Sequence, residues 1–164
     1  MKVDTLDFIV VAVAVGGFLG AVLHAALSDL RQYRIPNWTS ALAVLSFLPY
    51  AAAAGLDAPS FAWHASIGAV ALAGGFILFA LGTFGGGDAK MLAAVSLWAG
   101  PQHELIVLFV IALAGGVLAL AVLLFRRFPL AARLAAWKQM HSGEKGIPYG
   151  VAIAAGALAL LFRM

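Results

Sequence analysis

Phe84-Gly85-Gly86-Gly87-Asp88-Ala89-Lys90-Met91 lies between two hydrophobic segments of the chain. From Met91 to Gly100 there are only ten residues, about 15 Å of helix at 1.5 Å per residue, which cannot cross a hydrocarbon core of about 30 Å. A full span counted back from Pro101 therefore brings the glycines and Asp88 partly to membrane depth. Irregular backbone at that depth must be buried in protein or line a watery cavity. We expect a polar cavity around Asp88.

The composition is that of an integral membrane protein. Of the 164 residues, 64% are hydrophobic and 10% are charged, and the mean hydropathy is +1.03, whereas an average soluble domain is about 25% charged. The chain has no cysteine, which excludes disulfides, thiol catalysis and cysteine zinc sites within it. The small net charge of +3 argues against a nucleic-acid surface. We expect one membrane domain over residues 1–164, without an appended soluble domain or a cleavable signal peptide.

The hydropathy pattern predicts an all-α polytopic bundle, because a spanning helix needs roughly 20 apolar residues. Six spans are expected, at about 8–28, 38–54, 61–83, 86–100, 104–125 and 148–162. A short interfacial helix is expected after Pro129.

Small residues recur every four or seven positions on three of these spans, which predicts close packing between helices. The three sets are Ala12, Gly16 and Gly20; Gly68, Gly75 and Gly82; and Gly146, Gly150 and Ala154. His24 continues the first set, and we expect it to be buried and hydrogen-bonded.

The basic residues give the expected orientation. With six spans, loops 29–37, 84–90 and 126–147 share one side and carry all of the ten Lys and Arg residues except Lys2 and Arg163. The positive-inside rule places that side in the cytoplasm of a bacterial inner membrane. Both termini are then periplasmic, and Asp29 and Asp88 both lie on the cytoplasmic side.

Two aspartates at one membrane face suggest an aspartyl protease. A carboxylate at membrane depth is costly and is functional by default. In aspartyl proteolysis two carboxyl groups share one proton about a water: the ionised group is the base, and the protonated group donates to the scissile carbonyl. The titration belongs to the pair, and either acid can hold the proton. No metal or organic cofactor is expected, because the pair itself activates the water.

Each of these residues also has a structural interpretation. Asp29 can be an interfacial acid paired with Arg31 or Arg34, and Asp88 can cap the helix that it begins. Lys90 is either a positive-inside charge or a group that binds an acidic part of a substrate. The structural interpretations leave the three consecutive glycines unexplained. We expect Gly85, Gly86 and Gly87 to shape the loop or bind substrate, with Gly85 and Gly87 letting the loop approach substrate backbone closely.

Other polar groups carry less information. Asp57 and Glu104 are expected in outside loops, in contact with water. No pair of histidines has the spacing of a helical metal site, so no metal is expected.

Three segments together resemble the type IV prepilin peptidase family, within the GxGD membrane aspartyl proteases. Residues 85–91 are similar to its GxGD-x-K signature, and residues 147–152, Ile-Pro-Tyr-Gly-Val-Ala, are similar to its final-helix motif. The segment of its first catalytic aspartate is matched by Asp29, Arg31, Arg34, Ile35, Pro36 and Asn37. The resemblance implies that Asp29 and Asp88 are the catalytic pair.

The resemblance also implies the partner. The substrate is a prepilin in the lipid bilayer, with a basic leader, a glycine before the cut and a hydrophobic helix after it. The larger bifunctional members carry a loop with zinc-binding cysteines and also methylate the new N-terminus. Without cysteines, this chain is more similar to the short CpaA/TadV-type peptidases of tight-adherence (Flp) pili, and methylation is not expected.

Two other functions fit parts of the sequence. A presenilin-like intramembrane protease also uses two aspartates, but its first usually follows a tyrosine inside a helix, whereas Asp29 follows Ser28 at a helix end. A small ion or solute transporter also uses broken helices and buried acids. Inverted repeats would support a transporter, and no convincing repeat is found.

Overall fold

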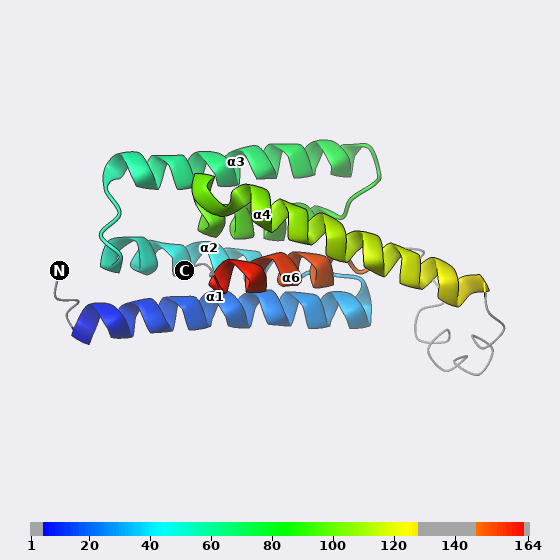
Figure 1. Ribbon diagram of the computed structural model, residues 1–164, viewed down its shortest axis with the longest axis horizontal. Helices are drawn as coiled ribbons and strands as arrows, with labels where there is room; N and C mark the ends of the chain where they lie inside the picture. Colours follow the sequence, from blue (N-terminus) through cyan, green and yellow to red (C-terminus); the bar gives the residue numbers. More distant parts are fainter. Residues whose placement is uncertain (1–4, 128–146, 163–164) are drawn as a thin grey trace.

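The computed structural model describes residues 5–127 and 147–162, and this part of the chain is helical, without a strand (Figure 1). The helices are α1 (Thr5–Gln32), α2 (Asn37–Ala53), α3 (Ala58–Ala80), α4 (Gly86–Arg127) and α6 (Tyr149–Leu161). The predicted all-α class is confirmed. The interfacial helix expected after Pro129 lies outside the described residues.

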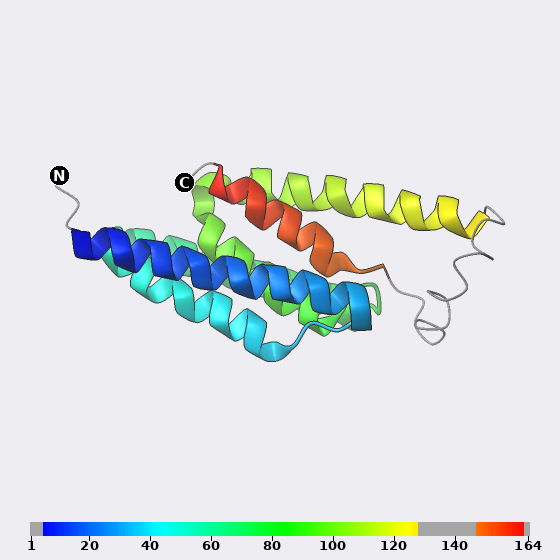
Figure 2. The ribbon, with the colours of Figure 1, turned by 90° about the horizontal axis from the view of Figure 1, so that it is seen from below.

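α4 reverses its direction at Gly100. The backbone there has φ 59° and ψ −174°, and the next residue, Pro101, lacks the N–H that a continuing helix needs. The Ser96 hydroxyl donates a 2.8 Å hydrogen bond to Glu104 Oε1, although eight residues of straight helix would separate the two by about 12 Å. The two limbs of α4, residues 86–99 and 101–127, therefore fold back on each other (Figure 2).

The expectation of six separate spans is wrong. Within the described residues, three helices are long and apolar enough to cross a membrane, namely α1, α3 and α4. The segments expected at 86–100 and 104–125 are both helical; they are the two limbs of α4, which meet at the non-helical Gly100 without an intervening loop. α2 and α6 are shorter, with 17 and 13 residues. The long apolar helices make the chain a membrane protein.

Trp98, on the first limb of α4, joins three helices at the centre of the core. Its buried ring stacks on Phe18 of α1 with centroids 4.4 Å apart, and it lies edge-on to Phe47 of α2 at 5.7 Å. The indole Nε1 donates to the Ala43 carbonyl at 2.8 Å. Burial of the large ring and a satisfied indole N–H both stabilise this junction.

The two aspartates lie at the same end of the bundle. The α1–α2 and α3–α4 connections lie at one end, whereas the α2–α3 connection and the reversal in α4 lie at the other (Figures 1 and 2). Asp29, near the end of α1, and Asp88, at the start of α4, are both at the first end, which we call the aspartate end.

The small-residue faces have different outcomes. A Cβ on Gly75 would come within 2.8 Å of the Ala89 Cβ, and one on Gly68 within 3.1 Å of the Leu97 Cβ. These two glycines let α3 lie directly on the first limb of α4, as predicted. Gly82, in contrast, lies beyond the end of α3 with φ 72°.

The face predicted to pack closely on α1 does not do so within the described residues. A Cβ on Gly16 or Gly20 would meet no atom within 4 Å. His24, on the same face, is exposed, and its ring lies 4.7 Å from that of Trp38. The expectation of a buried His24 is therefore wrong, because the periodicity identified a face without saying which neighbour covers it.

The reversal yields a first prediction. Replacing Gly100 by alanine should lower the free energy of unfolding by about 1–3 kcal/mol, because its backbone conformation is open almost only to glycine. The added Cβ would also overlap the ring of His64, which is itself hydrogen-bonded to the Leu97 carbonyl at 2.8 Å. Thermal unfolding in detergent measures the loss.

Gly116→Ala is the matched control, since a Cβ there meets no atom within 4 Å. Adding His64→Ala to Gly100→Ala should recover the part of the loss that is due to the overlap. Equal unfolding temperatures for Gly100→Ala and Gly116→Ala would contradict the importance assigned to Gly100.

Candidate active site

Asp29 is held by a tight turn at the end of α1. Tyr33 adopts a left-handed conformation with φ 48°, and its N–H donates to the Asp29 carbonyl at 2.8 Å. The Ser28 hydroxyl donates to the Arg34 carbonyl at 2.7 Å. These bonds fold residues 33–36 back over the helix end, and only 5% of the Asp29 surface remains exposed.

The Asp29 carboxylate is fixed by the start of α6. The Gly150 N–H donates to Asp29 Oδ2 at 2.7 Å. A Cβ on Gly150 would come within 2.9 Å of the Asp29 Cβ, so a glycine is required for this approach. Because the N-terminal end of a helix is partially positive, α6 provides a stabilising site for an anionic side chain.

Asp88 uses one of its two carboxylate oxygens to begin α4. The Gly85 N–H donates to Asp88 Oδ2 at 3.2 Å, and the Ala89 N–H donates to the Gly85 carbonyl at 3.0 Å. This is the acidic half of a capping box, in which the third helical residue accepts from the residue before the helix. The capping interpretation is thus correct for one oxygen. The other oxygen, Oδ1, is buried without a hydrogen-bond partner in the described part of the chain.

Ile35 lies where the segments that carry the two acids meet. A Cβ on Gly87 would come within 2.9 Å of the Ile35 Cβ, and a Cβ on Gly150 within 3.2 Å of the Ile35 Cδ1. The glycines thus let the starts of α4 and α6 close on the turn after Asp29. The segments that carry Asp29 and Asp88 therefore meet at one residue, Ile35.

The three glycines before Asp88 differ in what surrounds them. A Cβ on Gly85 would come within 2.5 Å of Asp88 Oδ2, and Gly87 has no space because of Ile35. Gly86 is open, since a Cβ there would lie 3.5 Å from the nearest atom, in the ring of Phe79. The close approach that the sequence predicts is therefore made by the chain itself, at two of the three positions.

Lys90 links the start of α4 to the start of α2. Its Nζ donates to Asn37 Oδ1 at 2.9 Å. On the opposite side of the site, the rings of Phe84 and Tyr149 meet edge-on with centroids 5.4 Å apart. These contacts position the Asp88 turn against α2 and α6.

The remaining candidate acids lie at the other end of the bundle. Asp57 is exposed and caps α3, and hydrogen bonds from Ser60 hold its pKa below the usual value. Glu104 is not in a loop, contrary to the expectation: it lies in α4, half-buried, and accepts from Ser96. In the part of the chain that the structure describes, no three His, Asp or Glu side chains lie close enough to hold a metal ion.

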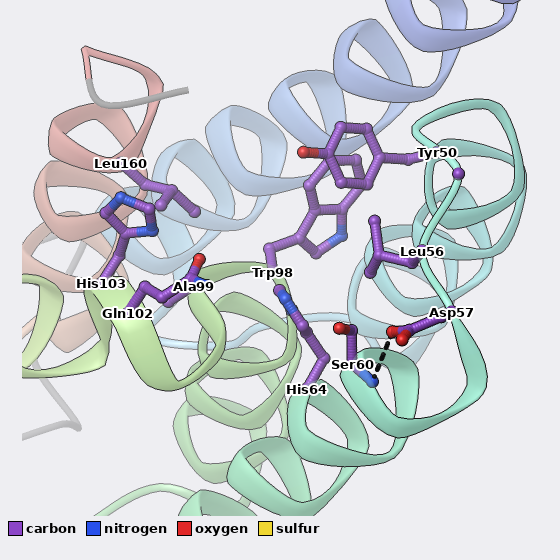
Figure 3. Close-up of a pocket in the computed structure, with 11 residues that line it drawn as sticks. Tyr50, Leu56, Asp57, Ser60, His64, Trp98, Ala99, Gln102, His103 and Leu160 are labelled. Carbon is purple, nitrogen blue, oxygen red and sulfur yellow. Dashed lines mark hydrogen bonds between the residues drawn. The ribbon is translucent and has the colours of Figure 1, made fainter.

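A polar cavity of about 630 Å³ also lies at this other end, away from the aspartates. Tyr50, Asp57, His64 and His103 are among the side chains that line it (Figure 3). It is not the cavity that the sequence predicts around Asp88.

The sequence prediction gives no role at the site to Ile35, Asn37 or Gly150, although it places Gly150 on a face that packs closely between helices. They are present in the segments that resemble a known family, but no rule of spacing relates them to the acids. A glycine at the start of a late hydrophobic segment, after Pro148, is the one available signal, because a helix beginning there provides free N–H groups.

Comparisons with known proteins identify the family that the chain is similar to. The sequence profile of the Type IV leader peptidase family matches residues 16–120, more than half of the chain. A curated relative from Bacillus subtilis (strain 168), a prepilin leader peptidase/N-methyltransferase, is 30% identical over 147 residues, covering 86% of this chain and 52% of its own length. The chain thus spans about half the length of that relative. No solved structure matches it.

The glycines give a second prediction. Gly87→Ala should lower the free energy of unfolding by about 1–3 kcal/mol, the usual range for overpacking, because its Cβ meets the Cβ and the carbonyl oxygen of Ile35 at 2.9 and 3.1 Å. Gly86→Ala, one residue earlier, should be neutral. Denaturation in detergent compares the two. Equal stabilities would contradict the close contact with Ile35.

Proposed function

Because the chain belongs to the Type IV leader peptidase family, we propose that it is a membrane aspartyl endopeptidase that removes the leader peptide from prepilins, with Asp29 and Asp88 as its catalytic pair. The observation that supports this is that the end of α1, which carries Asp29, and the start of α4, which carries Asp88, meet at Ile35 at one end of the bundle. One oxygen of each acid accepts from a backbone N–H. The remaining oxygens are the groups that would hold a water.

The proposed reaction follows from that arrangement. The ionised member of the pair takes a proton from a water held between the two carboxyl groups. The protonated member donates to the scissile carbonyl oxygen as the water attacks the carbon. Because the backbone bonds to Gly85 and Gly150 fix both carboxyl groups in place, the pair is positioned before substrate binds.

We further propose that the enzyme works on the cytoplasmic side of a bacterial inner membrane. The aspartate end carries Arg31, Arg34 and Lys90, and the positive-inside rule favours the cytoplasm for such an end. A prepilin whose basic leader is retained in the cytoplasm would present its cut site to this end of the bundle.

The proposed substrates are Flp-type prepilins, and the proposed reaction is cleavage alone. The 164 residues contain no cysteine, so they hold no counterpart of the zinc-binding cysteine loop of the bifunctional members. This supports the likeness to the short CpaA/TadV-type peptidases. Lys90 acts in this proposal by holding the Asp88 turn through Asn37.

A third prediction tests the pair. The chain is produced with a Flp-type prepilin in cells, and the size of the pilin is followed on a gel. Asp29→Asn and Asp88→Asn should each lower the cleavage rate by at least about a hundredfold, the range of general acid–base catalysis, while the protein still inserts into the membrane.

Asp57→Asn is the matched control. It makes the same chemical change at an exposed cap, where asparagine serves equally well, and it should cleave at the normal rate. Cleavage by either dyad variant at the control's rate would exclude the proposed mechanism. A cut within the substrate helix, not before it, would favour a presenilin-like protease.

A further inference from the structure

An apolar groove lies between α3 and the second limb of α4. Its volume is about 460 Å³. The side chains that define it are Val70, Gly74 and Ile77 of α3, Leu92 of the first limb of α4, and Glu104 and Leu108 of the second limb. The first limb is its floor, because α3 and the second limb both pack on it through Gly75 and Ser96.

The floor of the groove continues to Asp88. Asp88, Leu92 and Ser96 are four residues apart, so they lie along one face of the first limb. Leu92 lines the groove, and Ser96 donates to Glu104 at its far end. From Asp88 to Ser96 the helix rises about 12 Å. An object in the groove would therefore have one end at the Asp88 turn.

Two features of the groove suit a helix. Gly74 is open, since a Cβ there would meet nothing within 4 Å, and an open glycine lets a second helix approach closely in lipid. Glu104 Oε2 is buried and has no hydrogen-bond partner among the described residues. Because that oxygen is buried in the free chain, a donor reaches it only if the Glu104 side chain turns into the groove. A docked helix can carry such a donor, whereas a lipid chain cannot.

We propose that this groove binds the hydrophobic helix that follows the cleavage site of the substrate. The helix runs antiparallel to α3, with its first turn at Asp88 and a hydrogen-bond donor about eight residues later at Glu104, from the rise of 1.5 Å per residue. This inference rests on the proposed function, because it assigns the docking surface for the same substrate. The groove then positions the scissile bond at the aspartates.

Disulfide cross-linking tests the docking. Because the chain has no native cysteine, only the introduced cysteine of the enzyme can form a disulfide with the substrate. Val70→Cys is placed in an Asp88→Asn background, so that the prepilin stays uncleaved, and single cysteines are moved along the substrate helix. Val70 is 71% exposed. The contacts of Gly75 with Ala89 and of Gly68 with Leu97 place Val70 between Ala89 and Leu97 along the first limb of α4. A cysteine at Val70 should therefore cross-link to a substrate residue about six positions after the cut.

Ile77→Cys, two turns along α3 on the same face, should cross-link close to the cut. Val13→Cys is the control: it is 69% exposed on α1, outside the groove, and should give no cross-link above background. Equal cross-linking from Val70 and Val13 would overturn the inference. So would cross-linking of Val70 and Ile77 to the same position of the substrate helix. Cross-links between two copies of the chain would show that a second copy occupies the groove, and would overturn it as well.

Filling the groove is the second measurement. Gly74→Leu should lower kcat/KM for prepilin cleavage by about tenfold, mainly through KM, since the lost contacts bind the substrate. Gly20→Leu, at another open helical glycine on α1, should leave it unchanged. If wild type does not cleave, the proposed function fails. If wild type cleaves and the two leucine variants cleave alike, only the groove assignment fails.

Discussion

Enclosing two carboxyl groups at one end of an apolar helical bundle is the constraint on which the rest of this structure depends. An acid enclosed in this way must receive hydrogen bonds, because water is scarce there. The chain provides them with backbone N–H groups at two helix starts, Gly150 for Asp29 and Gly85 for Asp88. Those helices must begin at the aspartate end, and their first turns must come within contact distance of the acids. This is why glycine occupies positions 85, 87 and 150, where a Cβ would collide.

The reversal at Gly100 follows from the same constraint. If α4 began at Asp88 and ran straight, it would leave the bundle without returning toward the aspartate end. By turning at Gly100, the chain sends the second limb back, so that α6 packs against it and begins beside Asp29. The bond from Ser96 to Glu104 holds the limbs together at the turn.

Much of this arrangement could be predicted from the sequence, and the failures have physical causes. The helical class and the proximity of two acids at one end follow from hydropathy and from where Asp29 and Asp88 stand in the chain. The abrupt reversal could not be predicted, because the sequence does not show that the single residue Gly100 turns the chain without a loop between the two helical segments. The open face of Gly16 and Gly20 was missed for a different reason: spacing identifies a face, and only the neighbours decide whether it is covered.

The position of Asp88 makes its structural role compatible with the catalytic role that we propose for it. A carboxylate has two oxygens. Oδ2 accepts from Gly85 and so fixes the start of α4, while Oδ1 has no partner in the described residues. Without the bond from Gly85, the Asp88 carboxyl group would be free to rotate. With a second such bond, no oxygen would remain to hold a water. Asp29 follows the same division, since Oδ2 is the oxygen that accepts from Gly150. The capping interpretation and the proposed catalytic one therefore describe different oxygens of Asp88, and the cap holds in position the oxygen that we propose to be catalytic.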